Sequence, residues 1–214
     1  MLLKIYRRAR QSSFGWLAAL AVGCGSAIGA AAQEPMTGSL LVASPELTDP
    51  MYAHAVILVL RHDDEGTIGV VINRPTNLVP STIFPELKQS IGAYTGNLFR
   101  GGPIAPTRLL YVVRGLAAAT VNGPEVLDKV FLSVDDDSLP DMTRLADGTN
   151  DLRFYAGHAA WVPGQLESEI NAGGWEILPA SEDLVFHADP GSLWKELEGR
   201  GATGGGVVAA LGAD

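Results

Sequence analysis

Two apolar runs joined by a short polar turn constrain the fold of this chain more than any other feature. Ala55–Leu60 reads AVILVL and Thr67–Asn73 reads TIGVVIN, and both are rich in the residues that favour strands. The polar stretch His62–Gly66 between them ends in a glycine, which permits the backbone angles of a tight turn. The pattern predicts an antiparallel hairpin with buried strands.

Shorter strand and helix patterns follow one another along the rest of the chain. A chain of 214 residues with 47% hydrophobic residues, no internal repeat and no linker predicts a single α+β domain. Further strands are expected at Ser39–Ala43, Arg108–Val113, Val130–Val134 and Leu152–Ala156, with Trp175–Leu178 and Leu184–His187 as a closing strand pair. Short helices are expected at Pro80–Ser90, Leu139–Leu145, Pro163–Asn171 and Pro190–Glu198.

The N-terminal segment has the order of a secretory signal. Its basic residues come first, Phe14–Ala32 is apolar, and Ala30-Ala31-Ala32 offers the small residues that signal peptidase accepts. We therefore expect residues 1–32 to be a cleaved signal peptide and the protein to be exported to the periplasm. The body is then expected at 33–198, followed by a Gly-rich flexible tail at 199–214.

Three other fates of this segment also fit the sequence. The apolar stretch is long enough to remain as a membrane anchor, which is the one case in which we expect a membrane contact. Ala21-Val22-Gly23-Cys24 loosely resembles a lipoprotein cleavage box, which would leave Cys24 lipidated. Translation from Met36 would instead produce a cytoplasmic protein.

Charge argues against a nucleic-acid partner. Residues 1–33 hold four of the 15 basic residues and no acidic one, so the remainder carries 11 basic and 24 acidic residues, a net charge of −13. Such a surface repels phosphates, and no cluster of Lys and Arg interrupts it. We expect no direct contact with nucleic acid.

No motif for a reaction, metal or cofactor is present in the sequence. The four histidines lack HxH or HExxH spacing, there is no GxSxG elbow or phosphate loop, and the single cysteine lies in the N-terminal segment. We therefore expect no catalytic residue, metal or cofactor, and favour a non-enzymatic protein. The alternative is a hydrolase or transferase that acts through His158 with Glu167 or Arg100.

Four separated motifs resemble those of the YqgE/AlgH family, also called UPF0301 or DUF179. They are Ser39–Pro45 with Asp49-Pro50, Gly69–Pro75, Arg100–Ile104 and Gly157–Glu169, in order over about residues 38–197. The resemblance implies an α+β fold with a mixed, largely antiparallel, bifurcated sheet curled into a pseudo-barrel with a few short helices. The resemblance implies no agreed catalytic residues. It does imply a proposed link to the transcriptional control of alginate production in some bacteria. The expected function is an exported binding or regulatory protein, and the alternative is a cytoplasmic transcription-linked regulator translated from Met36.

The ends of these motifs are expected to converge on one polar cleft. Pro75 should end its strand and direct Arg74 outward. The paired glycines and the neighbouring guanidinium suit a phosphate or carboxylate, so the expected partner is an unknown protein or a small anionic ligand. The hypothesis fails if Arg74, Gly102 and Gln165 lie on different faces. The candidate binding residues are Asn73, Arg74, Arg100, Gly101, Gly102, His158, Trp161 and Gln165.

Overall fold

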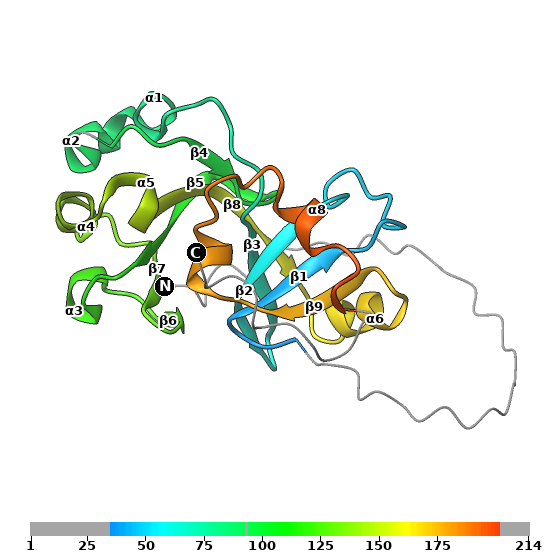
Figure 1. The fold of residues 1–214 in the computed structure, drawn as a ribbon. Coiled ribbons are helices and arrows are strands. Elements are labelled where there is room, and N and C mark those ends of the chain that lie inside the picture. The colour runs from blue at the N-terminus through cyan, green and yellow to red at the C-terminus, as the bar shows by residue number, and fades with distance from the viewer. Residues whose placement is uncertain (1–34, 93, 202–214) are drawn as a thin grey trace, which may run out of the picture. The chain divides into compact units, whose positions relative to one another are not determined.

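The computed structural model describes residues 35–92 and 94–201 (Figure 1). The expected signal peptide and all but the first three residues of the expected tail lie outside these ranges. The strands are β1 (Ser39–Ala43), β2 (Val56–Asp63), β3 (Gly66–Val71), β4 (Leu98–Arg100), β5 (Ile104–Arg114), β6 (Glu125–Leu127), β7 (Val130–Ser133), β8 (Leu152–Trp161) and β9 (Trp175–Pro179). The helices are α1 (Pro80–Ile83), the 3-10 helix η2 (Pro85–Leu87), α2 (Lys88–Ile91), α3 (Ala118–Val121), α4 (Leu139–Leu145), α5 (Gly148–Asp151), α6 (Gln165–Asn171), α7 (Glu182–Val185) and α8 (Leu193–Leu197).

The nine strands form one sheet that forks at β8. Eight of them follow the order β6-β7-β5-β8-β3-β2-β1-β9, with antiparallel neighbours, while β4 pairs with β8 in parallel. The first half of β8 pairs with both β5 and β4, and its second half pairs with β3 along residues 159–161. This arrangement confirms the expected bifurcated, largely antiparallel sheet and the predicted hairpin of β2 and β3.

The sheet curls into a half-barrel, because its far ends approach each other. β6 lies at one end of the strand order, yet a Cβ added at Gly38, just before β1, would lie only 2.6 Å from the Val126 carbonyl oxygen on β6. Side chains that alternate along each strand therefore enter two different environments. Leu40 and Val42 of β1 face the concave interior, whereas Leu41 and Ala43 face the outside.

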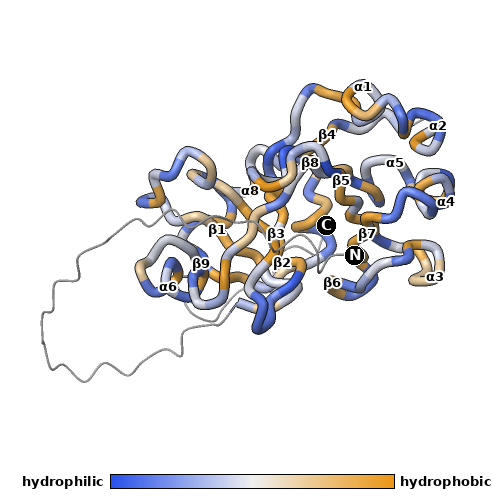
Figure 2. Tube along the Cα trace, turned by 180° about the vertical axis from the view of Figure 1, so that it is seen from behind, coloured by the Kyte–Doolittle hydropathy of each residue, from blue (hydrophilic) through white to orange (hydrophobic). Residues whose placement is uncertain are grey.

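Both faces of the sheet are buried, which explains the apolar runs without polar alternation. Helix α6 and the loop before β2 cover the outer face of the β1–β3 half, and helices α1 to α5 gather along the β5–β7 half (Figure 1). The concave face is filled by residues of α7 and α8. Figure 2 shows the hydrophobic residues concentrated along the central strands, with hydrophilic residues at the outer turns.

One expected strand is wrong. Leu184–His187 was predicted to pair with Trp175–Leu178, but Glu182–Val185 forms helix α7. Ser181 accepts a hydrogen bond from the Leu184 backbone N–H at 3.3 Å, and acidic residues occupy the first turn, so the segment has the chemistry of a helix start. Strand β9 pairs with β1 instead.

In the part of the chain that the structure describes, no helix has the length and apolar character needed to cross a membrane.

Candidate functional site

Three of the four motifs meet where β3, β4 and β8 come together. The Val71 backbone N–H donates to the Gly101 carbonyl at 2.8 Å, and the Arg100 N–H donates to the Arg74 carbonyl at 2.9 Å. The Gly101 N–H donates in turn to the Ala156 carbonyl at 2.9 Å. Both backbone groups of Gly101 are therefore engaged within the sheet, and its N–H is not available to an anion.

Close backbone contacts at this junction require glycine. A Cβ at Gly101 would lie 2.3 Å from the Gly157 carbonyl oxygen, and one at Gly102 would lie 2.2 Å from the carbonyl carbon of His158. Real Cβ atoms do not approach backbone atoms so closely. Gly101 and Gly102 thus allow the backbone after β4 to pack directly against the backbone of β8, and both residues are buried.

Asn73 and Arg74 hold the loop before β2. The Asn73 amide accepts from the Val56 N–H and donates to the His54 carbonyl, each at 2.9 Å. The Arg74 guanidinium donates to the carbonyls of Met51 at 2.7 Å and Ala53 at 2.9 Å. The prediction that Arg74 points outward is wrong, because these otherwise unpaired carbonyls draw the half-buried side chain onto the loop.

Trp161 and Gln165 converge on Glu169, a residue that the sequence reasoning missed. The Glu169 carboxylate accepts from the indole N–H groups of Trp161 and Trp175, both at 2.9 Å, and from the Gln165 amide at 3.0 Å. The spacing of Gln165 and Glu169 by four residues on a helix was the available signal, since such residues lie on one face. Trp161 is buried, so it anchors α6 to the sheet.

Tyr52 joins this cluster to Arg74. Its ring stacks on Trp161 with centroids 6.0 Å apart and meets the edge of Trp175 at 5.8 Å. Burial raises the pKa of Tyr52 to about 12, and the negative charges of Asp49 and Glu169 add to this effect. The positive charge of Arg74 acts in the opposite direction. Tyr52 also escaped the sequence reasoning, because its role depends on contacts with three distant segments.

Among the described residues, His158 does not contact the carboxylate suggested as its catalytic partner. Its side chain is buried, and this burial lowers its pKa. None of the hydrogen bonds and ion pairs in residues 35–92 and 94–201 joins it to a carboxylate. Glu167, its suggested partner, instead lies 3.6 Å from His62 Nε2.

Arg100 is the candidate whose charge remains accessible. It is exposed, and among the described residues no hydrogen bond or ion pair involves its guanidinium. The Arg100 backbone N–H donates to the Arg74 carbonyl at 2.9 Å, so the two residues are adjacent, and the Arg100 charge adds to burial in lowering the pKa of Arg74. We call Tyr52, Arg74 and Arg100 the arginine surface.

The eight candidates therefore have different surroundings. Gly102 is packed against the His158 backbone, Arg74 is half-buried on the loop, and Gln165 is exposed on α6. Whether any of them contacts a ligand stays a prediction.

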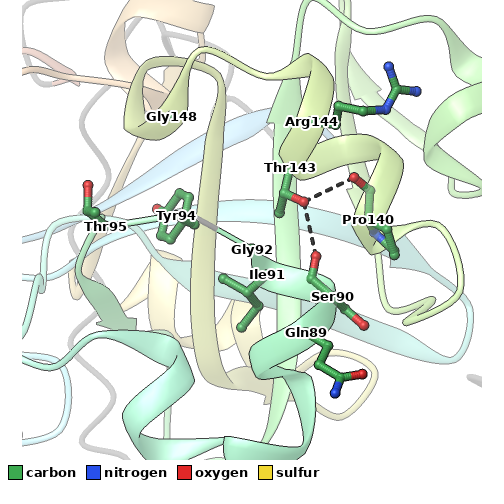
Figure 3. Close-up of a pocket in the computed structure, with 10 residues that line it drawn as sticks. All are labelled: Gln89, Ser90, Ile91, Gly92, Tyr94, Thr95, Pro140, Thr143, Arg144 and Gly148. Carbon is green, nitrogen blue, oxygen red and sulfur yellow. Dashed lines mark hydrogen bonds between the residues drawn. The ribbon is translucent and has the colours of Figure 1, made fainter.

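A pocket of about 430 Å³ lies elsewhere, between α2 and α4 (Figure 3). Its wall is held by Thr143 Oγ1, which bonds to the carbonyls of Ser90 and Pro140, as the dashed lines show. The Tyr94 hydroxyl donates to the Leu152 carbonyl at 3.0 Å. None of the eight candidates lines this pocket, and in the described ranges no three His, Cys, Asp or Glu residues are grouped to hold a metal.

The fold and these contacts define a class of small α+β domain with a forked half-barrel sheet. In this class, as seen here, residues of the sequence motifs hold the surface loop before β2. The chain belongs to the AlgH-like family (DUF179), whose sequence profile matches residues 40–201. It is 37% identical to a UPF0301 protein of Streptomyces avermitilis over 166 residues, or 76% of this chain and 84% of the relative. It is 32% identical to one of Thioalkalivibrio sulfidiphilus over 171 residues, or 79% and 91%.

Two solved structures share the fold. A crystal structure of a Corynebacterium diphtheriae protein matches with a TM-score of 0.66 and 27% identity, covering 78% of this chain and 87% of that one. The solution structure of the AlgH protein from Pseudomonas aeruginosa matches with a TM-score of 0.62 and 25% identity, covering 75% and 86%. The predicted family and fold class are confirmed.

Proposed function

We propose that this chain is a non-enzymatic binding or regulatory protein that holds an anionic group of its partner at the arginine surface. The observation that carries the proposal is the exposed Arg100 guanidinium, which has no ion pair among the described residues and lies beside Arg74. An anion between the two groups would relieve their mutual repulsion.

In the part of the chain that the structure describes, Arg100 has no ion pair although the chain is rich in carboxylates. The chain after residue 33 carries a net charge of −13, so carboxylates are plentiful, yet none of the described ion pairs neutralises Arg100. Burial and the Arg100 charge lower the pKa of Arg74, whereas Tyr52 and Asp49 act to raise it. A planar guanidinium with five N–H donors suits the oxygens of a carboxylate or phosphate.

An NMR titration of the protein with inorganic phosphate and with acetate tests this function. We expect saturable shifts in residues near β4, and a loss of affinity of about tenfold in Arg100→Gln, since a charge-assisted hydrogen bond contributes on the order of 1.5–3 kcal/mol. Arg144→Gln is the matched control, because Arg144 is exposed but paired with Asp141 at 2.8 Å. Equal weakening in both variants, or no saturable shift, contradicts the proposal.

We also propose that the protein is exported and acts in the periplasm. The support is the order of basic, apolar and small residues in the first 32 positions. The test is the intact mass and N-terminal sequence of the protein from fractions of its native host. A periplasmic form that begins at Gln33 is the expected result. A cytoplasmic form that begins at Met36, a retained anchor or a lipid on Cys24 each overturns it.

A further inference from the structure

A positive charge lies inside the half-barrel without a counter-ion. Arg153 is on β8, 5% exposed, and its guanidinium lies over the rings of Phe99 at 5.1 Å and Phe186 at 5.4 Å. Two of its nitrogens donate to the carbonyls of Val185 at 3.0 Å and His187 at 2.6 Å. Among the described residues, it forms no ion pair with a carboxylate, which is unusual for a buried charge.

Two polar atoms at this place have no hydrogen-bond partner. They are Nε of Arg153 and the hydroxyl of Tyr155, and both are inaccessible to solvent. Burial raises the pKa of Tyr155 to about 12, while the Arg153 charge and a hydrogen-bonding interaction with the Arg153 side chain act to lower it. The two groups are therefore close, although the distance and angle between them do not meet those of a full hydrogen bond. Buried polar groups left unpaired are costly and rare, and a ligand that brought a matching polar group to this place would satisfy them.

The segment 181–200, which we call the C-terminal strap, covers this place. It contributes Val185, Phe186, Leu193 and Leu197 to the concave core. Among the described residues, no backbone hydrogen bond joins the strap to the sheet, since every such bond in the strap stays inside it. The strap is therefore held by side chains, and it can leave without breaking a strand pairing.

We propose that the concave interior binds a carboxylate-headed acyl chain, which displaces the C-terminal strap. The ligand carboxylate would replace the Val185 and His187 carbonyls at the Arg153 guanidinium and would also accept the free Arg153 Nε–H and the Tyr155 hydroxyl.

The side chains that line the concave interior indicate the class of ligand. A guanidinium presents its donors in a planar fork that matches a carboxylate. Around it, β1, β2, β3 with the residue after it, β5 and β7 contribute aliphatic side chains to the concave core, which suits an alkyl chain. These wall residues are Leu40, Val42, Val56, Leu58, Leu60, Val70, Ile72, Leu110, Val112, Val130 and Leu132.

Arg114 of β5 carries the charge that contacts the strap. Arg114 lies 3.6 Å from Asp183 of the strap and 3.3 Å from Asp151, and its guanidinium lies over the Phe186 ring at 4.9 Å. These contacts are exposed at Asp183, so they oppose strap release only weakly.

Isothermal titration of the full chain with dodecanoate tests the proposal, with dodecanol as the ligand that lacks the carboxylate. We expect saturable binding of dodecanoate, and at least about tenfold weaker binding of dodecanol and of dodecanoate to Tyr155→Phe. Tyr155→Phe removes only an unpartnered hydroxyl, so the variant should fold normally. Tyr94→Phe is the matched control, because that hydroxyl bonds to the Leu152 carbonyl on the other face of the sheet.

Hydrogen exchange supplies the second readout. Dodecanoate is expected to accelerate amide exchange in residues 182–198 and to leave β1 and β2 protected, since only the strap moves. The proposal is overturned if dodecanoate does not bind, if dodecanol binds as tightly, if Tyr155→Phe retains full affinity, or if the strap keeps its protection.

Discussion

At the scale of single residues, Glu169 shows how one carboxylate organises a motif. It accepts three N–H donors, from the two indoles and from the Gln165 amide. Glutamine at this position would offer a single carbonyl oxygen in place of two carboxylate oxygens, and its NH₂ group would face other donors. The motif thus needs a carboxylate at position 169 for structural reasons, and no reaction has to be invoked.

His158 should make the stability of the protein depend on pH. Burial lowers the pKa of His158 in the folded state. As the pH falls below about 6.5, His158 therefore binds a proton more readily in the unfolded chain than in the folded one. The free energy of unfolding is therefore expected to fall as the pH is lowered through this value, by up to about 1.4 kcal/mol per pH unit from this group. Urea unfolding of the protein and of His158→Gln between pH 7.5 and 5 measures the effect.

In His158→Gln, the free energy of unfolding should depend less steeply on pH than in the unaltered protein. At pH 7.5, the stability of this variant should change only because the packing around residue 158 changes. His54→Asn is the control, since His54 is exposed and has a backbone φ of 59° that asparagine tolerates. An unchanged slope in His158→Gln would show that the ring is protonated in the folded protein.

The roles of the candidate residues were harder to predict than their proximity. The ends of three motifs were expected to converge, and backbone hydrogen bonds do join β3, β4 and β8 there. The direction of Arg74 was missed because its carbonyl partners lie more than 20 residues earlier in the chain. Tyr52 was missed for the same reason.

At the scale of elements, segments whose hydrophobic pattern and turn residues agree were predicted correctly, and segments in which these signals conflict or are absent were not. The strands β1 and β7 and the helix α4 agree with the expected ranges to within a residue, because hydrophobic pattern and turn residues point the same way. Strand β4 has three residues and leaves no periodic signal. Helix α7 was mistaken for a strand because apolar residues outweighed the helix-start signal at Ser181.

Arg74 is expected to control the loop at residues 49–54. Arg74→Lys keeps the positive charge but presents one ammonium group, which cannot span the two carbonyls in the planar geometry of a guanidinium. We expect faster amide exchange in this loop and a loss of about 1 kcal/mol in the free energy of unfolding. Arg100→Lys is the matched control, because none of the described hydrogen bonds involves the Arg100 side chain. Equal exchange in both variants would mean that the aromatic cluster alone fixes the loop.

At the scale of the whole molecule, the fork in the sheet depends on one left-handed residue. Gly157 has a φ of 72°, and it lies where β8 passes from its pairing with β4 to its pairing with β3. This conformation lets the strand continue to Trp161 instead of ending at Ala156, where the sequence pattern had placed its end. All three hydrophobic cores contain residues of β8, so the fork links them.

Gly157→Ala is therefore expected to destabilise the whole domain. A Cβ at this position would lie 2.5 Å from the Gly102 carbonyl oxygen and 2.8 Å from that of Ile104, and neither backbone segment can move without opening the sheet. Together with the left-handed backbone, this should cost about 3 kcal/mol or more of the free energy of unfolding, measured by urea denaturation. Gly173→Ala separates the two causes, because Gly173 has a similar φ of 80° but nothing within 4 Å of the added Cβ. That variant should lose only about 1 kcal/mol. If both variants lose the same amount, backbone strain alone is responsible, and the close packing at the fork contributes nothing to stability.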